Sequence, residues 1–440
     1  MTFEKDLRAA ITGRVLVPGD AGFDAARTPW NVAIDQRVRA VVDVADAADV
    51  AAAVRCAGLA GLAVTTQTTG HGAAGDVDGV VLLRTAALDG VEVLPQERIA
   101  RVGAGVRWGA VLAAASPHGL TGLAGSSPGV GVVGYTLGGG LSWFSRRYGL
   151  AADAVRSFDV VTADGATARV SAESDAELFW ALRGGGGDLA VVTAVEFELK
   201  PAPQLYGGRM MWPADRAAEL LDVYRTVTAS APDELTVWLD LLDFSAFGGA
   251  PAVAVDVTHL GSAAEGAALL KPFDEVAGRT ADGRRMLPVA ELGSICAEPL
   301  DPSPGRSRTE LLGELDDAAA AALLDRPIAP LLSVQLRQLG GALGRPAPDG
   351  GATGGFTEQH LVYMFGIPTA PDVAAAIGER QSELAAALRP VTTGRKPFTM
   401  LAPGERAAAA FPGAALARLR DVKRARDPHG VLRSNFPVLA

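Results

Sequence analysis

The segment 67–75 constrains the fold of this chain more than any other part of the sequence. It reads Gln-Thr-Thr-Gly-His-Gly-Ala-Ala-Gly and follows directly on the apolar residues 62–64. A strand that leads into a glycine-flanked loop lets backbone N–H groups approach a phosphate or diphosphate closely. His71 would then lie beside the molecule that carries the diphosphate. The alternative is a tight turn with a surface histidine, and this segment alone does not decide between the two.

Composition narrows the class of protein. The chain has 440 residues, which is enough for two domains or for one large α/β domain with an insertion. It contains no run of the ~20 apolar residues that a membrane-spanning helix requires, and its charged N-terminus lacks the features of a signal peptide. Two cysteines do not suffice for a disulfide framework or a cysteine-based zinc site, and a net charge of −10 disfavours nucleic-acid binding. We expect a cytoplasmic protein without a metal, membrane or nucleic-acid partner.

The apolar periodicity predicts strands and helices in alternation through the first half of the chain. Expected strands cover 39–44, 62–66, 79–83, 91–94, 99–105, 158–162, 168–171 and 190–199, and expected helices cover 47–59, 108–115 and 176–182. Asp46 is placed to cap the helix at 47–59. A Pro-Ala-Pro sequence at 201–203 then interrupts the pattern, so we expect a domain boundary near residue 200.

The second half has a different pattern. Expected strands cover 235–242, 252–259, 331–339 and 360–366, and expected helices cover 263–276 and 373–388. A stretch rich in Gly and Pro at 340–355 separates two of these strands. Strands grouped in this way predict an α+β domain built on an antiparallel sheet.

A dinucleotide-binding fingerprint is present only superficially. Residues 129–134 match the pattern G-x-G-x-x-G. The fingerprint has an acidic residue ~20 positions further on, and Asp153 lies near that position. However, a Ser-Ser-Pro sequence precedes the glycines where a strand is required, and the glycines at 138–140 interrupt the helix that should follow. We therefore expect no Rossmann-type NAD site, and we expect the glycine-rich region 119–140 to lie along an extended ligand.

Taken together, the motifs of this chain resemble those of a known family. They are Gly-His-Gly at 70–72, Gly-Ser-Ser-Pro at 125–128, Gly-Val-Val-Gly-Tyr-Thr-Leu-Gly-Gly-Gly at 131–140, Arg-Tyr-Gly-Leu-Ala-Ala-Asp at 147–153, the segment 177–187, Val-Val-Thr at 191–193, and Asp427-Pro428 with Asn435. The series is similar to that of the berberine-bridge-enzyme-like branch of the vanillyl-alcohol-oxidase family, the PCMH-type FAD-linked oxidases. The resemblance covers residues 15–200 and 400–440.

This resemblance implies an α+β fold with a two-subdomain, PCMH-type FAD-binding domain at residues 1–200. A substrate domain at 201–399, built on the antiparallel sheet, is inserted before a C-terminal segment at 400–440 that returns to the FAD-binding domain. The resemblance also implies FAD bonded covalently through its 8α-methyl group to His71. The residues matched to cofactor contacts are Gln67, Thr68, Thr69, Gly70, His71, Gly72, Ala73, Ser127, Gly131, Val132, Val133, Gly134, Tyr135, Leu141, Val192 and Asn435.

Three departures from the family pattern matter. Gln67 occupies a position where many relatives have arginine, which predicts a less basic diphosphate site. Ser127 occupies the position of the second, cysteinyl flavin bond of bicovalent members; a hydroxyl is a poor substitute for a thiolate, so we expect a single covalent bond. The Tyr-Gly-x-Asn segment that supplies an active-site tyrosine in many relatives is absent before Asp427, so the catalytic base of the family does not transfer.

Polar residues on the expected strands of the second half are the candidates for the substrate site. Gln335 and Arg337 share one face of their strand and are candidate substrate ligands. Candidate catalytic groups are Tyr363, His360 and, from the glycine-rich region, Tyr135. His360 and Tyr363 point to opposite faces of one strand, so only one of them can face the flavin. We favour Tyr363, because a phenol accepts the substrate proton without carrying a buried charge beforehand.

The resemblance implies an FAD-dependent oxidase or dehydrogenase. Such an enzyme takes a hydride from a small organic substrate, a secondary metabolite or a sugar, to flavin N5, with O2 as electron acceptor. Two alternatives remain open from the sequence: a biosynthetic cyclase or desaturase, and a flavin-binding protein without turnover. All three need the same FAD site, so the motifs do not separate them. Residues 205–395 contain no motif that identifies the substrate.

Overall fold

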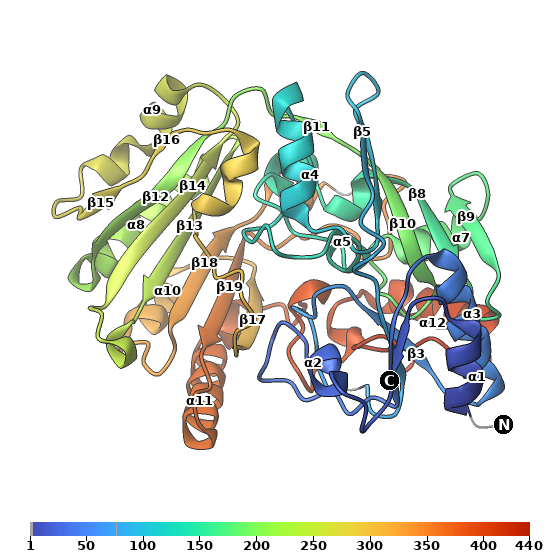
Figure 1. Cartoon of the computed structure of the whole chain (residues 1–440). Coiled ribbons are helices and arrows are strands. Elements are labelled where there is room, and N and C mark those ends of the chain that lie inside the picture. The colour runs from blue at the N-terminus through green and yellow to red at the C-terminus, as the bar shows by residue number, and fades with distance from the viewer. Residues whose placement is uncertain (1–2, 76, 346) are drawn as a thin grey trace.

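The computed structural model describes residues 3–75, 77–345 and 347–440. Figure 1 shows two parts side by side. The first is formed by the N-terminal half together with α12 (Gly413–Arg426), and the second is built on one large sheet with helices on its outer side. The α+β class and the antiparallel sheets expected from the sequence are confirmed. No helix among the described residues is long and apolar enough to cross a bilayer.

The first sheet carries the strand that leads into the loop at 67–75. Its order is β1 (Arg14–Leu16), β2 (Ala40–Asp43), β4 (Val81–Arg84) and β3 (Val64–Gln67), and β2, β4 and β3 run parallel. The helices of this region are α1 (Phe3–Ala10), α2 (Phe23–Arg27) and α3 (Ala47–Leu59). Asp46 caps α3 as predicted, because its side chain accepts from the N–H groups of Ala48 and Asp49. The loop after β3 lies at the carboxyl ends of the parallel strands, where such sheets bind ligands.

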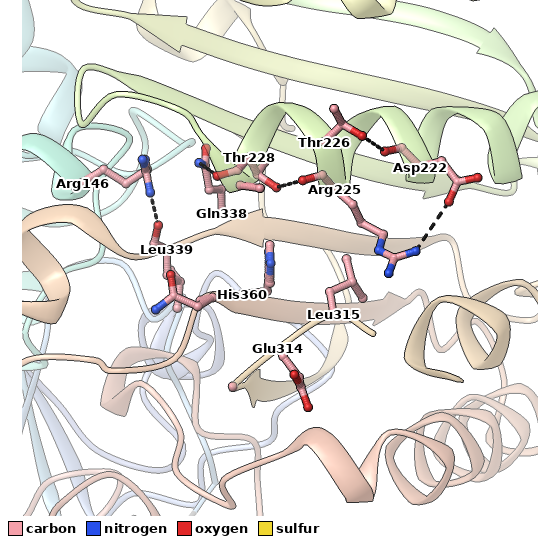
Figure 2. A pocket seen from close by; sticks show the side chains of 13 residues that line it. Arg146, Asp222, Arg225, Thr226, Thr228, Glu314, Leu315, Gln338, Leu339 and His360 are labelled. Atoms are coloured by element: carbon pink, nitrogen blue, oxygen red, sulfur yellow. Dashed lines mark hydrogen bonds and ion pairs between the residues drawn. The ribbon is translucent and has the colours of Figure 1, made fainter. Parts of the chain in front are cut away.

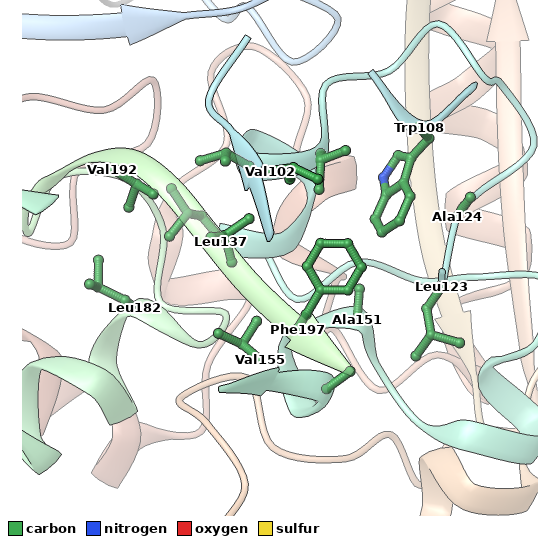
Figure 3. Packing of buried hydrophobic residues seen from close by; sticks show 14 of the residues in the cluster. Val102, Trp108, Leu123, Ala124, Leu137, Ala151, Val155, Leu182, Val192 and Phe197 are labelled. Atoms are coloured by element: carbon green, nitrogen blue, oxygen red, sulfur yellow. The ribbon is translucent and has the colours of Figure 1, made fainter. Parts of the chain in front are cut away.

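The second sheet is antiparallel, and its side chains form much of the core of the first part. Its order is β5 (Val91–Leu94), β6 (Ile99–Gly103), β10 (Val191–Glu198), β8 (Val155–Val161) and β9 (Thr167–Ser171). Around it lie α4 (Trp108–Ala115), α5 (Val132–Leu137), α6 (Ser145–Tyr148), α7 (Ala176–Leu182) and the strand pair β7 (Leu120–Thr121) and β11 (Lys200–Pro201). Figure 3 shows Leu137 of α5 and Val192 of β10 in this core beside Trp108 and Phe197, whose rings meet edge-on at 5.7 Å between centroids. The core therefore fixes α5 against the sheet.

The third sheet is the framework of the second part. Its order is β15 (Ala281–Asp282), β12 (Tyr206–Pro213), β14 (Ala252–His259), β13 (Leu235–Leu242), β18 (Ser333–Gln338), β19 (His360–Gly366) and β17 (Arg306–Leu312), with β16 (Arg285–Met286) also paired to β12. The helices of this part are α8 (Ala217–Ala229), α9 (Ala263–Asp274), α10 (Asp317–Leu324) and α11 (Pro371–Ala387). Short 3-10 turns are η1 (Ser116–His118), η2 (Ala151–Ala154), η3 (Ala214–Arg216), η4 (Ser245–Phe247), η5 (Val289–Ser294), η6 (Gly341–Gly344), η7 (Arg389–Val391), η8 (Phe398–Met400) and η9 (Ala407–Ala409).

The two faces of the third sheet differ. Alternating apolar side chains such as Val237 and Leu239 pack under the helices in one core. The next residues in the alternation face the first part, where Thr236 Oγ1 donates to the carbonyl of Trp143 at 2.8 Å. The rings of Trp143 and Trp238 stack with 3.6 Å between their centroids. This second face is therefore the one that covers the first part.

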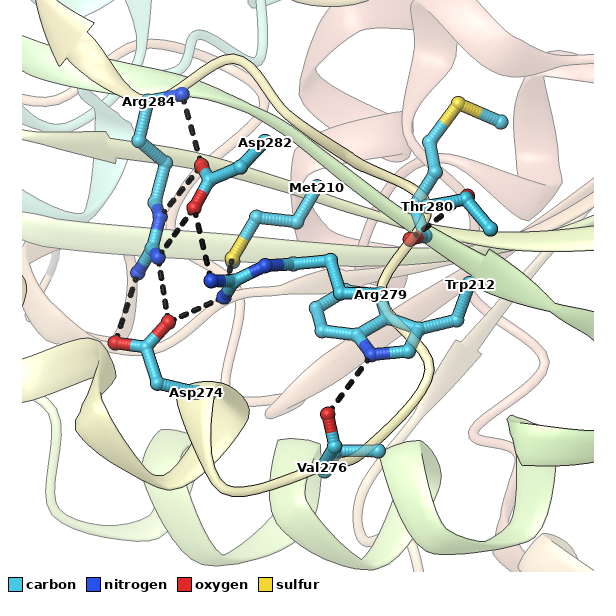
Figure 4. A network of polar contacts seen from close by, with 9 residues as sticks. Met210, Trp212, Asp274, Val276, Arg279, Thr280, Asp282 and Arg284 are labelled. Carbon is cyan, nitrogen blue, oxygen red and sulfur yellow. Dashed lines mark hydrogen bonds and ion pairs between the residues drawn. The ribbon is translucent and has the colours of Figure 1, made fainter.

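A charge network holds the strands β15 and β16 at the edge of the third sheet. Figure 4 shows Arg279 and Arg284 both reaching Asp274 and Asp282. Arg284 Nη2 lies 2.5 Å from Asp274 and 2.7 Å from Asp282. The carboxylates are partly exposed, so the network fixes the geometry of this edge and adds little to stability.

Several elements were not predicted from the sequence. In the second part, β12, α8, β17 and α10 are among them. β12 contains two glycines near its start and ends at Pro213, and β17 carries Arg306, Arg308 and Glu310. Both strands therefore fail the apolar alternation by which strands are recognised. α8 and α10 have apolar residues at helical spacing, which the prediction overlooked.

The C-terminal segment lies against the first sheet. The N–H group of Val64 on β3 donates to the carbonyl of Val431 at 2.7 Å. Lys423 Nζ on α12 donates to the carbonyls of Asp188 and Leu432, at 2.6 Å each. These contacts therefore hold the C-terminal segment beside β3, the strand that leads into the loop at 67–75.

Candidate functional site

The loop after β3 is shaped by Gly70 and Gly72. Gly70 has φ +88°, a conformation that favours glycine. A Cβ atom at Gly70 would lie 2.5 Å from Pro29 Cβ and 2.9 Å from Gln67 Cδ, so a side chain there would force the loop apart. A Cβ atom at Gly72 would meet nothing within 4 Å. The loop therefore packs closely on one side of His71 and leaves open space on the other.

His71 is held by ring stacking and presents one free ring nitrogen. Its ring stacks on Trp30 with 4.2 Å between centroids, and Nδ1 lies 2.8 Å from Thr69 Oγ1. Nε2 is buried, and the described residues supply no hydrogen-bond partner for it. Burial, assisted by the charge of Arg107, lowers the pKa of His71 to about 4, so the imidazole is neutral at neutral pH. When Nδ1 donates its proton to Thr69, Nε2 carries the free lone pair of a nucleophile.

The glycine-rich stretch lies directly beside this loop. A Cβ atom on Gly131 would lie 3.1 Å from Thr68 Cβ, and α5 begins at the next residue. Val132 and Val133 belong to the apolar core, so only their backbone groups are available to a ligand. A Cβ atom at Gly134 would meet nothing within 4 Å. This stretch therefore presents backbone to the space beside the loop.

Tyr135 lies on α5 between the loop and the third sheet. Its ring meets Trp108 edge-on at 5.5 Å between centroids. Its hydroxyl is buried and has no hydrogen-bond partner among the described residues. Burial raises the pKa of Tyr135, and the charge of Arg337 on β18 opposes that rise, so the two side chains lie within electrostatic reach.

Two arginines bring positive charge to the loop. Arg84 is the register partner of Gln67 on the adjacent parallel strand, and its Nη1 is buried without a partner in the described part of the chain. Burial lowers the pKa of Arg84, the charge of Asp43 opposes this shift, and the charge of Arg107 adds to it. The less basic site expected from Gln67 alone is therefore offset by Arg84, which strand pairing places beside it.

The remaining cofactor candidates lie in separate places. Ser127 is buried within the glycine-rich region, ahead of Gly131, and its Oγ accepts from the N–H group of Gly129 at 3.3 Å. Val192 points into the core from β10. Leu141 packs in an apolar cluster with leucines of the third sheet, so its side chain supports the contact between the two parts. The Oδ1 atom of Asn435 is buried with no partner among the described residues.

The buried polar atoms around β3 and its loop fit FAD. Those without a partner among the described residues are Gln67 Nε2, His71 Nε2, Arg84 Nη1, Tyr135 OH, Ser434 Oγ and Asn435 Oδ1. Leaving a buried polar group unpaired costs about 1–3 kcal/mol. Several such groups in one region indicate a ligand that satisfies them, and the diphosphate and flavin ring of FAD offer both acceptors and donors.

The facing side of the third sheet bears Tyr363, Gln335 and Arg337. Gln335 and Tyr363 are register partners on β18 and β19. The guanidinium carbon of Arg337 lies 4.0 Å from the ring centroid of Trp238 and 5.3 Å from that of Tyr363. Arg337 Nε donates to Gln335 Oε1 at 2.6 Å. Burial raises the pKa of Tyr363, so its phenol is protonated at neutral pH.

His360 lies on the opposite face of the third sheet. Its Nδ1 atom is 3.2 Å from the hydroxyl of Tyr224 on α8. It borders a cavity of about 680 Å³ between α8, the strand ends and the loop at 313–315, and Figure 2 shows its ring beneath α8. Burial lowers the pKa of His360 to about 4. His360 therefore lies on the face opposite to that of Tyr363, as strand alternation predicted.

The structure adds a carboxylate that the sequence analysis missed. Asp240 on β13 accepts from Ser333 Oγ at 2.6 Å and from Gln335 Nε2 at 3.1 Å. Burial raises the pKa of Asp240 to about 7, a range that suits a general base. The available signal was a lone carboxylate inside the otherwise apolar run 237–242.

Comparison with known proteins gives a consistent set of relatives. A family model described as an FAD binding domain matches residues 38–171. The (R)-6-hydroxynicotine oxidase of Paenarthrobacter nicotinovorans is 30% identical over 260 residues, which span 57% of this chain and 56% of that protein. The crystal structure of 6-hydroxy-D-nicotine oxidase from Arthrobacter nicotinovorans superposes with a TM-score of 0.84 and 26% identity, covering 97% of this chain and 98% of its own.

A further solved structure shares the fold. The glucooligosaccharide oxidase of Acremonium strictum, which has a 6-S-cysteinyl, 8α-N1-histidyl FAD, gives a TM-score of 0.85 at 22% identity and covers 98% of each chain. The aligned stretches span only 27% of the length of an FAD-dependent monooxygenase of Cochliobolus heterostrophus and 56% of that of the (R)-6-hydroxynicotine oxidase.

Proposed function

We propose that the chain belongs to the berberine-bridge-enzyme-like branch of the PCMH-type FAD-linked oxidases and that it is an FAD-dependent oxidoreductase. Its substrate is a small organic molecule, a secondary metabolite or a sugar, and its electron acceptor is O2. The observation that carries the proposal is the neutral, stacked imidazole of His71 in a glycine loop, among buried polar atoms without partners. Similarity to a 6-hydroxynicotine oxidase, both in sequence and in crystal structure, supports it.

The first part binds the cofactor, and the third sheet binds the substrate. FAD supplies a two-electron acceptor: an alcohol becomes a carbonyl or an amine becomes an imine, and O2 takes up the two electrons and two protons as hydrogen peroxide. Residues 68–73 and the backbone of 131–134 hold the cofactor, and Arg84 offsets the charge of its diphosphate. The face of the third sheet with Gln335 and Arg337 binds the substrate.

We propose one covalent bond, between His71 and the 8α-methyl carbon of FAD. It is supported by the neutral imidazole and by the free Nε2 atom. Forming the bond replaces one hydrogen of the methyl group; the proton leaves to solvent, and the two electrons pass to O2. The hydroxyl of Ser127 offers no thiolate for a second bond.

We assign the hydrogen bond to the substrate heteroatom to Tyr363 and the role of general base to Asp240. Tyr363, which the sequence analysis favoured as the acceptor of the substrate proton, is protonated at neutral pH, so we assign it instead a hydrogen bond that it donates to the substrate heteroatom. Asp240, whose pKa is raised to about 7, lies within electrostatic reach of Tyr363 and takes the proton that the substrate releases. Tyr135, on the opposite side, orients the substrate through its unpartnered hydroxyl.

A substrate screen tests the proposed activity. The purified flavoprotein is mixed with alcohols, amines, sugars and hydroxy acids, hydrogen peroxide is measured in air, and flavin bleaching is followed without oxygen. We expect at least one class to reduce the flavin and yield peroxide. A flavin that dithionite reduces but that no compound in the panel reduces would contradict the proposal and favour a flavin-binding protein without turnover. A product with a new ring or double bond would favour the cyclase or desaturase alternative.

We also propose that the protein is cytoplasmic. Its two cysteines, Cys56 and Cys296, are free, as expected for a chain kept in a reducing compartment. Cell fractionation followed by immunoblotting checks this location.

A further inference from the structure

Arg337 is a buried cation without a counter-ion among the described residues. The residue is 8% exposed, and its Nε donates to Gln335 Oε1. Within residues 3–75, 77–345 and 347–440, no carboxylate oxygen lies within 4.0 Å of its guanidinium, and neither Nη group has an acceptor. A buried charge without compensation is costly, so this arrangement calls for a partner from outside the chain.

Several other buried or half-buried cations of this protein are satisfied by the chain itself. They are Arg209 with Asp256, Lys423 with Asp427, Lys396 with Glu310 and Glu405, and Arg146 with the backbone carbonyls of Leu235, Ala231 and Pro232. Arg337 differs from all of these, because its two Nη groups remain free.

The carboxylates on the same sheet face do not neutralise Arg337. Asp240 already accepts from Ser333 and Gln335, and burial raises its pKa to about 7, so much of it is protonated near neutral pH. Asp256 on β14 makes two 2.7 Å bonds to Arg209. Neither group is therefore the partner of the free Nη edge.

Two aromatic rings and the amide of Gln335 pack against this guanidinium. The ring centroids of Trp238 and Tyr363 lie 4.0 and 5.3 Å from the guanidinium carbon, and Nε donates to Gln335 Oε1. The remaining edge carries N–H groups in one plane, the geometry that binds a carboxylate through two parallel hydrogen bonds. Tyr135, with its unpartnered hydroxyl, lies within electrostatic reach on the first part. The free donors of Arg337 and Tyr135 therefore belong to the same region between the two parts.

We propose that the substrate carries a carboxylate, which the Nη edge of Arg337 binds with the Tyr135 hydroxyl as a further donor. The substrate class is then a small hydroxy acid, amino acid or sugar acid. This inference rests on the proposed function, since it assigns the substrate of the same oxidoreductase. It predicts that the enzyme prefers substrates with a carboxylate over neutral alkaloids or sugars.

Matched pairs of ligands test this class. The flavoprotein is titrated with acetate and acetamide, lactate and lactamide, benzoate and benzamide, phenylacetate and phenylacetamide, and with phenyl phosphate, and binding is read from flavin absorbance and thermal shift. We expect at least one carboxylate to bind about 10-fold or more tightly than its amide, as a charge-assisted contact predicts. Arg337→Gln should remove the preference, and Arg337→Lys should retain part of it.

A matched control is Arg308→Gln, since Arg308 lies on the helical face of the same sheet, where it pairs with Glu310 at 2.8 Å. This variant should keep the preference. Equal binding of every acid and its amide by the unaltered protein would overturn the inference, and so would tighter binding of phenyl phosphate than of every carboxylate. A preference that survives Arg337→Gln while the flavin potential shifts would instead assign Arg337 to the flavin. Absence of bound FAD would refute the proposed function, which is a separate outcome.

Discussion

Burial sets the protonation of three site residues and thereby separates their roles. It lowers the pKa of His71 to about 4, raises that of Asp240 to about 7, and raises that of Tyr363 above its ordinary value. Only Asp240 changes charge near neutral pH, and only its carboxylate form accepts a proton. The rate of flavin reduction should therefore rise with pH through about 7. Asp240→Asn should remove this rise and slow reduction by about 10²–10⁴-fold, as for loss of a general base.

Anaerobic stopped flow between pH 5.5 and 9 measures this dependence. Tyr363→Phe is the comparison: it should slow reduction while keeping the rise near pH 7, because Asp240 is still present. A rise near pH 7 that persists in Asp240→Asn would remove Asp240 from the mechanism.

At the scale of elements, the pairing of β3 with β4 places Arg84 beside Gln67 at the foot of the loop. In a His71→Ala background, where FAD exchanges freely, Arg84→Met should weaken FAD binding by about 10-fold or more, because a charge-assisted contact to the diphosphate is lost. Titration of the apoprotein with FAD, followed by flavin fluorescence, gives the dissociation constant. The control is Arg37→Met, since Arg37 is exposed and pairs with Asp78. Equal affinities of both variants would exclude Arg84 from the cofactor site.

Apolar periodicity in the sequence predicted the helices and strands whose own residues carry a regular pattern. The helices at 47–59, 108–115 and 176–182 and the strands at 235–242 and 252–259 have the bounds expected from the sequence. The charged strand β17 was missed, because Glu310 is buried by pairing with Arg308 and Lys396 from elsewhere in the chain. The same limit applies to the site. The glycine loop around His71 is local and was recognised, whereas the roles proposed for Arg84 and Asp240 depend on strand register.

At the scale of the whole molecule, we propose that residues 400–440 complete an FAD-binding unit formed by 1–200, around the inserted substrate domain at 201–399. Lys423 ties this segment in place through Asp188, Leu432 and Asp427. Lys423→Met leaves Asp427 buried without its cation and should lower the free energy of unfolding by about 3–5 kcal/mol.

FAD binding should weaken in the same variant, since Asn435 follows this anchor. Chemical denaturation and FAD titration measure the two effects. Arg424→Met serves as control, because Arg424 pairs with Asp421 on the exposed side of α12. If Lys423→Met and Arg424→Met are equally stable and bind FAD equally well, the segment is not part of the FAD-binding unit.

Attachment of the flavin at His71 is tested most directly by acid precipitation of the purified protein, followed by mass spectrometry of the flavin-bearing peptide. The pellet should remain yellow, and the flavin mass should lie on the peptide that contains His71 and on no peptide that contains Ser127. His71→Ala should release all flavin to the supernatant under the same treatment. Complete release of FAD from the unaltered protein would contradict the covalent bond, and purified protein that neither contains nor takes up FAD would contradict the proposed function as a whole.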